Sequence, residues 1–189
     1  MRIYSWNVNG IRSAEKKGFV DWFKKTQPEL LCLQETRAEF DQVPEELQAP
    51  EGYFCYWNAC KKKKGYSGTA ILSQIEPDSV EYGFGIDEFD EEGRVVQLVF
   101  PDWVLNSIYF PNGGQGEDRI DYKLRFYDAY LDNCMDWLKR GRHVVLRDGA
   151  ARRTAVHPGV AAPAHDMPLF LRQGGQNTPE RIRLGRGRH

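Results

Sequence analysis

Residues 120–146, IDYKLRFYDAYLDNCMDWLKRGRHVVL, decide the fold class. Apolar residues recur in this stretch every three or four positions, at Ile120, Leu124, Tyr127, Leu131, Cys134 and Leu138. This spacing predicts a helix that buries one face. Two acidic residues precede the helix and three basic ones follow its last turn, as the helix dipole favours, and Gly141 is a stop signal. Residues 143–146 then predict a strand.

Strand-like segments also come before this helix. They span residues 2–8, 29–33, 53–58, 68–73, 94–100 and 103–110, and the last two predict a hairpin around Pro101 and Asp102. A short amphipathic helix over 19–23 must end before Pro28, and residues 112–117 form a Gly-rich loop. The mixture of helices and strands predicts an α/β or α+β fold.

The charge of the 189-residue chain is unevenly distributed, although its formal net charge is only −1. Residues 1–147 carry 19 basic and 24 acidic residues, which is −5, whereas residues 148–189 carry 7 Arg and 3 acidic residues, which is +4. Only one of the 24 aromatic residues, Phe170, lies in the second part. This composition predicts that residues 147–189 are a disordered Arg/Gly/Ala/Pro-rich tail outside the fold. A frame-shift or chimeric join would explain the change, and an arm that binds nucleic acid is the alternative.

The composition also excludes several classes of protein. With 41% hydrophobic and 13% aromatic residues the chain can build a core, which excludes collagen-like and disulfide-scaffold proteins. No apolar run approaches the roughly 20 residues of a membrane span. The start, MRIYSWNVNG, predicts a strand and not a signal peptide. The four cysteines lack metal-ligand spacing, so we expect buried thiols and a cytoplasmic protein.

Polar residues directly follow three of the predicted strands. Asn7 and Asn9 follow the first strand, Glu35 follows the second, and Asn112 follows the second strand of the hairpin. Strand ends are where α/β proteins often gather catalytic groups, although a single Glu after a strand is usually just solvated. An Asn together with a Glu suits a hard cation that keeps most of its waters and also binds a substrate phosphate.

Six segments then identify a family resemblance. They are SWNVNGIR (5–12), LLCLQETR (30–37), YWNACKKKKGYSGTAILS (56–73), NSIYFPNGG (106–114), RIDYKLRFYDAYL (119–131) and HVVL (143–146). In this order they resemble the exonuclease III family, the class II apurinic/apyrimidinic endonuclease branch of the endonuclease/exonuclease/phosphatase superfamily. The resemblance covers residues 1–146 and implies the DNase I-like four-layer α/β/β/α sandwich. It also implies a DNA repair nuclease that uses Mg²⁺ or Mn²⁺, cuts 5′ to abasic sites and trims 3′ ends.

The resemblance assigns roles to particular residues. Glu35 matches the metal-binding carboxylate, Asn7 the residue that orients the metal and the scissile phosphate, and Tyr109 the active-site tyrosine. Further matches predict DNA contacts at Lys62, Lys63, Lys64, Gly65, Tyr66, Ser67 and Asn112. Alternatively, Tyr109 is a core aromatic and the lysines are merely solvated. We expect Trp57 to be a core residue and not a platform for base stacking.

Two motifs of the family are missing from the sequence. After the HVVL strand the family has Gly-Asp-x-Asn, but this chain has Arg147-Asp148-Gly149-Ala150-Ala151. The family's later Ser-Asp-His segment has no counterpart, since His165-Asp166 has the reverse order. General acid–base groups contribute about 10²–10⁴ each to a rate, so we expect severely impaired activity.

The resemblance also predicts how much of the sandwich is present. We expect residues 1–147 to supply roughly the first sheet and its helices, which would leave an apolar sheet face exposed and the chain poorly stable. The expected partner is double-stranded DNA with abasic sites or 3′ ends. We expect the chain to be a monomer that does not bind membranes. The alternatives are a non-catalytic DNA-binding fragment and a relative that cleaves phospholipids or inositol phosphates.

Overall fold

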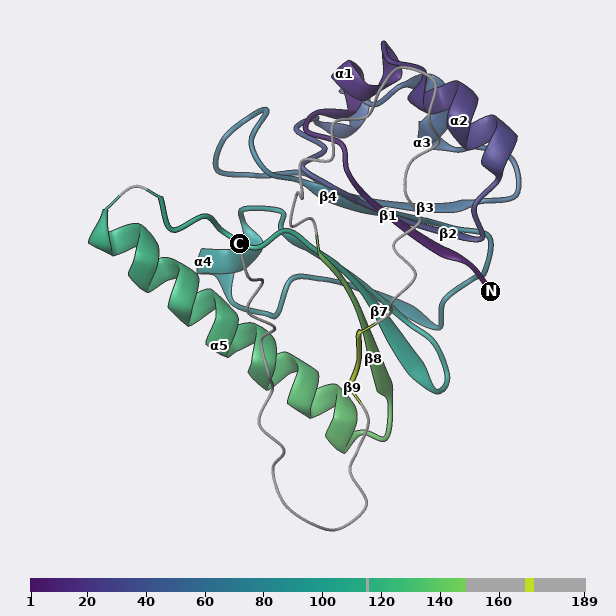
Figure 1. The fold of residues 1–189 in the computed structure, drawn as a ribbon. Coiled ribbons are helices and arrows are strands. Elements are labelled where there is room, and N and C mark those ends of the chain that lie inside the picture. The colour runs from purple at the N-terminus through teal and green to yellow at the C-terminus, as the bar shows by residue number, and fades with distance from the viewer. Residues whose placement is uncertain (115, 149–168, 172–189) are drawn as a thin grey trace, which may run out of the picture.

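The computed structural model describes residues 1–114, 116–148 and 169–171 (Figure 1). The first half of the fold contains β1 (Ile3–Asn7), α1 (Ile11–Glu15), α2 (Phe19–Thr26), β2 (Leu30–Gln34), the 3₁₀ turn η1 (Phe40–Gln42), α3 (Glu45–Gln48), β3 (Phe54–Asn58) and β4 (Thr69–Ser73). The second half contains β5 (Ser79–Tyr82), α4 (Asp87–Asp90), β6 (Val95–Val99), β7 (Trp103–Ile108), α5 (Glu117–Lys139), β8 (His143–Asp148) and β9 (Leu169–Leu171). Every predicted strand and both predicted helices are confirmed. The sequence analysis missed only short elements, such as α1, α3, α4, β5 and β9. The sequence predicts that residues 147–189 lie outside the fold, but residues 147 and 148 end β8, and Leu169–Leu171 pairs with β8 as β9. The rest of the predicted tail lies outside the described residues.

The strands form two mixed sheets. The first has the order β1-β2-β4-β3 and the second β5-β6-β7-β8-β9. β1 and β2 are parallel because α1 and α2 lie between them in sequence, and β7 and β8 are parallel because α5 connects them. The remaining pairs are antiparallel. As a result the last residues of β1 and β2, Asn7 and Gln34, are paired at one edge of the first sheet.

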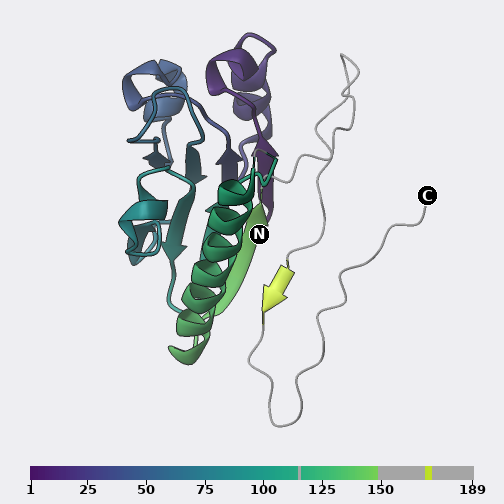
Figure 2. The same ribbon diagram turned by 90° about the vertical axis from the view of Figure 1, so that its left-hand side faces the viewer.

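Three hydrophobic clusters join these elements into four layers. One cluster fills the space between the first sheet and helices α1 and α2, and another lies between the second sheet and α5. The third cluster lies between the two sheets and includes Leu30, Ile71, Leu98 and Leu105. Figure 1 shows α1 and α2 on the outer side of the first sheet and α5 on the outer side of the second, and Figure 2 shows α5 in front of the strands. The described residues therefore build an α/β/β/α sandwich.

The expectation that residues 1–147 supply little more than the first sheet is wrong. They contribute β5, β6, β7 and β8 as well, which is most of the second sheet. The physical reason lies in β6 and β7, whose residues are buried on both faces except for Trp103. One face of these strands packs against the first sheet and the other against α5. The predicted instability rested on an exposed sheet face, and this reason for it no longer holds.

The predicted buried face of α5 is only partly correct. Cys134 and Leu138 are buried as predicted and Tyr127 is half-buried, but the other three predicted residues are exposed. The buried residues are Tyr122, Phe126, Tyr130, Cys134, Trp137 and Leu138, whereas Ile120, Leu124, Leu131 and Met135 are exposed. The helix thus carries two apolar stripes, and the aromatic one faces the second sheet. Aromatic side chains bury more surface than aliphatic ones, and their rings also contact one another, so this orientation is the more stable one.

The helix end and the cysteines follow the predictions more closely. Gly141 adopts a φ of 80° and donates its N–H to the carbonyl of Leu138 at 2.9 Å, which confirms it as the stop of α5. All four cysteines are free, and all are buried except Cys55, which is half-buried. Burial raises the pKa of Cys32 to about 12, so this thiol stays protonated at neutral pH. Within the described part of the chain no helix is long and apolar enough to cross a membrane.

Candidate functional site

The candidate site lies where the carboxyl ends of neighbouring strands meet. Asn7 is the last residue of β1, Glu35 directly follows β2, and Tyr109 directly follows β7 of the second sheet. Because β1 and β2 are parallel and β7 packs against β2, these ends come together at one edge of the sandwich. The structure thus brings together three of the residues that the sequence analysis singled out.

Glu35 is the centre of this group. Its Oε1 accepts a hydrogen bond from Asn7 Nδ2 at 3.3 Å, and its Oε2 accepts one from Arg37 Nη2 at 2.7 Å. The Tyr109 hydroxyl lies close enough to this carboxylate for Glu35 to raise the pKa of the phenol. Asn7 Oδ1 in turn accepts the N–H of Asn9 at 3.1 Å, so the Asn7 amide is held with its nitrogen towards Glu35.

The backbone around Glu35 is strained and held from two sides. Glu35 and Arg37 have φ values of 53° and 50°, in the left-handed region that few residues other than glycine adopt. Gly10 donates its N–H to the Glu35 carbonyl at 2.7 Å, and Arg37 donates its N–H to the Ser67 carbonyl at 2.9 Å. Such strain persists only where surrounding contacts enforce it, and it is frequent at functional sites.

Gly68 explains why the loop before β4 can approach Glu35 so closely. It has a φ of +88°, and a Cβ at this position would lie 2.3 Å from Thr36 Oγ1. Its carbonyl accepts the N–H of Thr36 at 3.1 Å. The loop over 65–68, whose first three residues are predicted to contact DNA and which we call the phosphate-binding loop, is therefore joined directly to the segment that carries Glu35.

Tyr109 is half-buried near Glu35 and does not belong to the hydrophobic clusters. Burial, together with the hydrogen bond to Glu35 and the negative charge of that carboxylate, raises the pKa of Tyr109 to about 12. The nearby guanidinium of Arg94 acts in the opposite direction. At neutral pH the phenol is protonated and acts as a hydrogen-bond donor.

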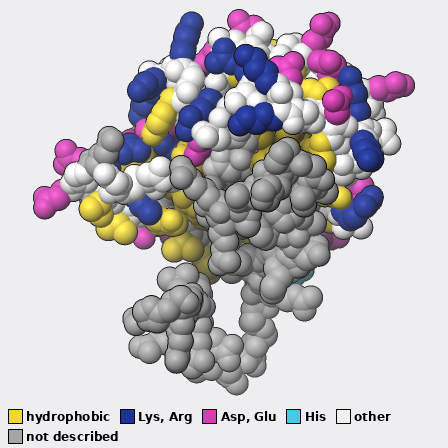
Figure 3. Space-filling view, turned by 45° about the horizontal axis from the view of Figure 1, so that its top comes forward, with side chains coloured by type: hydrophobic (Ala, Val, Ile, Leu, Met, Phe, Trp, Pro, Cys, Tyr) yellow, Lys and Arg dark blue, Asp and Glu magenta, His cyan; other side chains and the backbone are white. Residues whose placement is uncertain are grey.

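The lysine-rich loop, Lys61–Lys64, and Asn112 lie on the surface of the protein. Lys61–Lys64 are all exposed, but Lys62 already donates to the Glu88 carbonyl at 2.9 Å and forms an ion pair with Glu91 at 3.4 Å. Lys63 lies above the ring of Tyr66, 5.8 Å from its centroid. Asn112 is exposed in the loop after β7. Figure 3 shows Lys and Arg side chains interspersed with Asp and Glu on the face of the molecule that carries α1 and α2.

Some residues of the site were not predicted from the sequence. Arg37 binds Glu35, while Glu92, Arg94 and Arg119 form a charged group beside Tyr66. Arg37 could have been suspected because it stands two residues after Glu35 in the same motif. Arg94 begins a predicted strand and Arg119 begins one of the six family segments, but no pattern in the sequence set these two or Glu92 apart as site residues. Trp57, in contrast, packs against the first hydrophobic cluster as expected.

The donor atoms at the site fit a hard divalent cation. Glu35 offers carboxylate oxygens, and Asn7 offers an amide beside them. Mg²⁺ commonly uses one or two protein carboxylates and completes its shell with water and substrate phosphate. In the ranges that the structure describes, no three His, Cys, Asp or Glu side chains are grouped as metal ligands. Binding to this chain would therefore depend on Glu35. His165-Asp166 lies outside the described residues.

Removing the charge of Arg37 is expected to strengthen binding of Mn²⁺ about three- to tenfold. The guanidinium lies on the carboxylate that would bind the cation, and each unit charge at about 4 Å is worth roughly 1 kcal/mol even in water. The Arg37 side chain is 45% exposed and can move away, which limits the effect. Calorimetric titration of Arg37→Gln with Mn²⁺ measures it, with Lys25→Gln on α2 as the control for lost charge. Unchanged or weaker affinity would contradict the prediction.

Comparisons with known proteins show the family of the chain. Residues 4–171 match the model of the Endonuclease/Exonuclease/phosphatase family. The chain is 42% identical over 147 residues to an exodeoxyribonuclease of Bacillus subtilis, an alignment that covers 77% of this chain and 56% of that protein. It is 44% identical over 135 residues to the DNA repair nuclease APEX1 of Danio rerio, over 69% of this chain and 44% of that protein.

A solved structure extends the comparison to the fold. The 3′ phosphatase NExo from Neisseria, bound to a product DNA hairpin, superposes with a TM-score of 0.67 at 26% identity, over 78% of this chain and 56% of that one. The chain spans about half the length of the curated relatives that it matches. Because the family model matches most of the chain, the chain belongs to the endonuclease/exonuclease/phosphatase family, and the relatives that it matches are an exodeoxyribonuclease and a DNA repair nuclease.

Proposed function

We propose that this chain provides the metal-binding and phosphate-binding half of a DNA phosphodiesterase site that acts at abasic sites and 3′ ends. The observation that supports it is the convergence of Asn7, Glu35 and Tyr109 at one edge of the sandwich, beside the loop over 65–68. The names of the relatives, an exodeoxyribonuclease and a DNA repair nuclease, support DNA as the substrate.

Each of the three residues has a distinct task in this proposal. Glu35 holds a Mg²⁺ ion, which when bound neutralises negative charge on the scissile phosphate. Asn7 fixes one oxygen of Glu35 through its amide. Tyr109, which is protonated at neutral pH, lies near Glu35 in the free protein and donates a hydrogen bond to a phosphate oxygen when DNA is present. Lys63 and Lys64 add salt-sensitive attraction for the DNA backbone.

We also propose that this chain hydrolyses the DNA phosphodiester bond only very slowly. The family's Gly-Asp-x-Asn motif would stand at the end of β8, where this sequence has Asp148-Gly149-Ala150-Ala151 instead. Without the Asp that readies the attacking water and the His of Ser-Asp-His, the phosphate can be bound but is not attacked efficiently. With about 10²–10⁴ for each group, the rate should fall by at least about 10⁴.

DNA binding and cleavage can be tested with one duplex that carries an abasic-site analogue and a fluorophore. We expect anisotropy titrations to show binding that weakens steeply as salt increases. Lys63→Ala/Lys64→Ala should reduce both the affinity and the salt slope. Lys24→Ala/Lys25→Ala on α2 removes the same charge away from the loop and should have little effect. Binding that is insensitive to salt would contradict the proposed phosphate contacts.

Cleavage is then measured on a natural abasic site with Mg²⁺ present. The Bacillus subtilis exodeoxyribonuclease serves as the positive control. We expect product formation at least about 10⁴ slower than with that enzyme. Efficient cleavage that is lost in Glu35→Gln would overturn the impairment, whereas binding without cleavage fits a non-catalytic DNA-binding fragment.

A further inference from the structure

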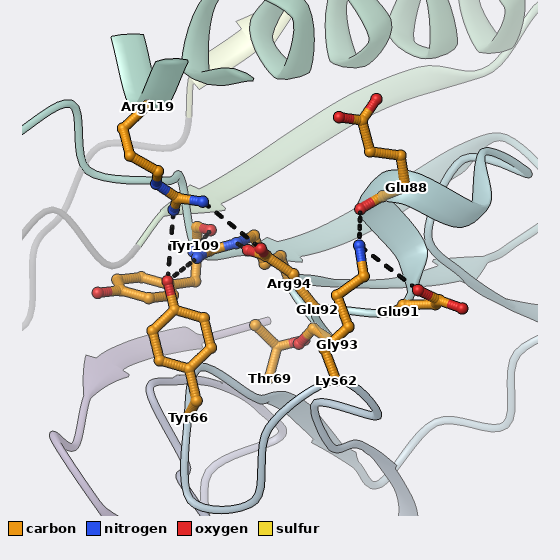
Figure 4. Close-up of polar contacts among 10 residues, drawn as sticks. All are labelled: Lys62, Tyr66, Thr69, Glu88, Glu91, Glu92, Gly93, Arg94, Tyr109 and Arg119. Atoms are coloured by element: carbon orange, nitrogen blue, oxygen red, sulfur yellow. Dashed lines mark hydrogen bonds and ion pairs between the residues drawn. The ribbon is translucent and has the colours of Figure 1, made fainter. Parts of the chain in front are cut away.

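Arg94 is the largest fully buried side chain among the described residues, with a relative exposure of 1%. It directly precedes β6 and lies beside the candidate site (Figure 4). Its Nε donates to Glu92 Oε2 at 2.5 Å, its Nη1 to the Tyr109 carbonyl at 3.1 Å, and its Nη2 to the Tyr66 hydroxyl at 2.8 Å. All three guanidinium nitrogens are therefore bound, and two of them hold tyrosines predicted to be in the DNA site.

The same guanidinium also contacts the rings of both tyrosines. Its carbon lies 5.4 Å from the ring centroid of Tyr66 and 5.0 Å from that of Tyr109. Tyr66 belongs to the loop between β3 and β4 of the first sheet, and Tyr109 follows β7 of the second sheet. One side chain thus connects the phosphate-binding loop on one sheet with the active-site tyrosine on the other.

The main chain around Arg94 is fixed as well. The Arg94 carbonyl accepts the N–H of Tyr109 at 2.9 Å, and the Gly93 carbonyl accepts a hydrogen bond from Thr69 Oγ1 at 3.1 Å. Gly93 has a φ of +64°, and a Cβ there would lie 2.6 Å from the carbonyl carbon of Ala59. These contacts fix the main chain at Arg94, so the residue cannot shift outward to reach DNA.

The burial of the charged Arg94 side chain costs free energy of folding, which a merely structural role would not require. Taking a guanidinium and a carboxylate out of water costs several kcal/mol per ion, and apolar residues of similar size often replace such pairs without loss of stability. The partner Glu92 is itself nearly buried and also pairs with Arg119 at 3.6 Å. Arg119 is partly exposed and lies 3.4 Å from the Tyr66 hydroxyl, so it is a second and looser contact of the same tyrosine.

We propose that Arg94 is a positioning residue, which holds the Tyr66 hydroxyl and the Tyr109 main chain in one arrangement so that the loop over 65–68 and Tyr109 bind the same DNA phosphate. This inference rests on the proposed DNA-binding function. Arg94 itself does not touch the DNA.

Three variants test this role. Arg94→Met removes the hydrogen bonds at similar volume, Arg94→Lys keeps the charge but not the planar fork, and Tyr66→Phe removes only one hydroxyl. We expect Arg94→Met and Tyr66→Phe each to weaken binding to the abasic duplex about five- to tenfold. The double variant should be no weaker than Arg94→Met, because both changes remove one shared interaction. Arg125→Met on the exposed face of α5 controls for lost charge and should bind within about twofold of the wild type.

NMR spectra of the free protein with ¹³C-labelled tyrosine rings provide the readout that separates positioning from stability. We expect the Tyr66 and Tyr109 signals to shift in Arg94→Lys and Arg94→Met, while Tyr53, which contacts the first cluster, keeps its signal. If Arg94→Met does not fold, Arg94→Lys and Tyr66→Phe still test the role. Unchanged Tyr66 and Tyr109 signals in folded Arg94→Lys, or additive losses in the double variant, would overturn the inference. Failure of the wild type to bind DNA would instead overturn the proposed function. The Tyr66 and Tyr109 signals of the free protein would then still test whether Arg94 positions these tyrosines.

Discussion

Glu35→Gln is expected to reduce the affinity of the chain for Mn²⁺ at least tenfold without unfolding it. Among the described residues, Glu35 is the carboxylate that the structure places with Asn7 and Tyr109, and its replacement leaves a neutral amide of the same shape. Mutation of a residue that only hydrogen-bonds to a metal ligand typically lowers the affinity for the metal about 10–100-fold, so loss of a direct ligand should lower it at least as much. Calorimetric titration at low salt measures the change, and Mn²⁺ is used because it can also be followed by its electron paramagnetic resonance.

The control for this experiment is Glu51→Gln, which removes the same charge in an exposed turn before β3. It should leave the affinity for Mn²⁺ within about twofold, because screening by water and salt makes a distant exposed carboxylate unimportant. If Glu35→Gln bound Mn²⁺ as tightly as the wild type, Glu35 would not be the ligand. If both variants lost the same affinity, binding would reflect only overall charge.

The strand ends that carry Asn7 and Glu35 could be predicted from the sequence because their signal is local. A short apolar strand followed at once by a polar residue places that residue at the sheet edge, and two parallel strands bring two such residues together. The same holds for Gly141, whose place after the last apolar residue marks the end of α5. The family motifs then added Tyr109, which residue patterns alone left as a possible core aromatic.

The charged group around Arg94 could not be predicted in this way. Glu92 and Arg94 lie in a turn rich in charged residues, where the usual expectation is solvation. Their burial depends on Tyr66 and Arg119, which are 28 and 25 positions away from Arg94 along the chain. Similarly, the second sheet was underestimated because β6 and β7 were recognised as a hairpin, but their burial on both faces depends on partners distant in sequence.

The largest expected effect on stability follows from the corrected orientation of α5. Phe126 is fully buried, and its ring centroid lies 5.3 Å from those of both Phe84 and Phe89. Phe126→Ala would leave a cavity in this aromatic cluster. Replacement of a buried Phe by Ala costs about 3–5 kcal/mol of the free energy of unfolding. Urea denaturation followed by far-UV circular dichroism measures this loss.

Leu124→Ala is the matched control, because it truncates an apolar residue two positions away on the same helix. Leu124 is 57% exposed, although the helical spacing of the sequence predicts it to be buried. Surface substitutions usually change stability by less than about 0.5 kcal/mol, so the two variants should differ by several kcal/mol. The opposite order of the two losses would mean that α5 packs through its aliphatic stripe after all. A single cooperative transition in the wild type would further show that the sandwich over the described residues folds as a unit, since a partly molten chain would give a broad one.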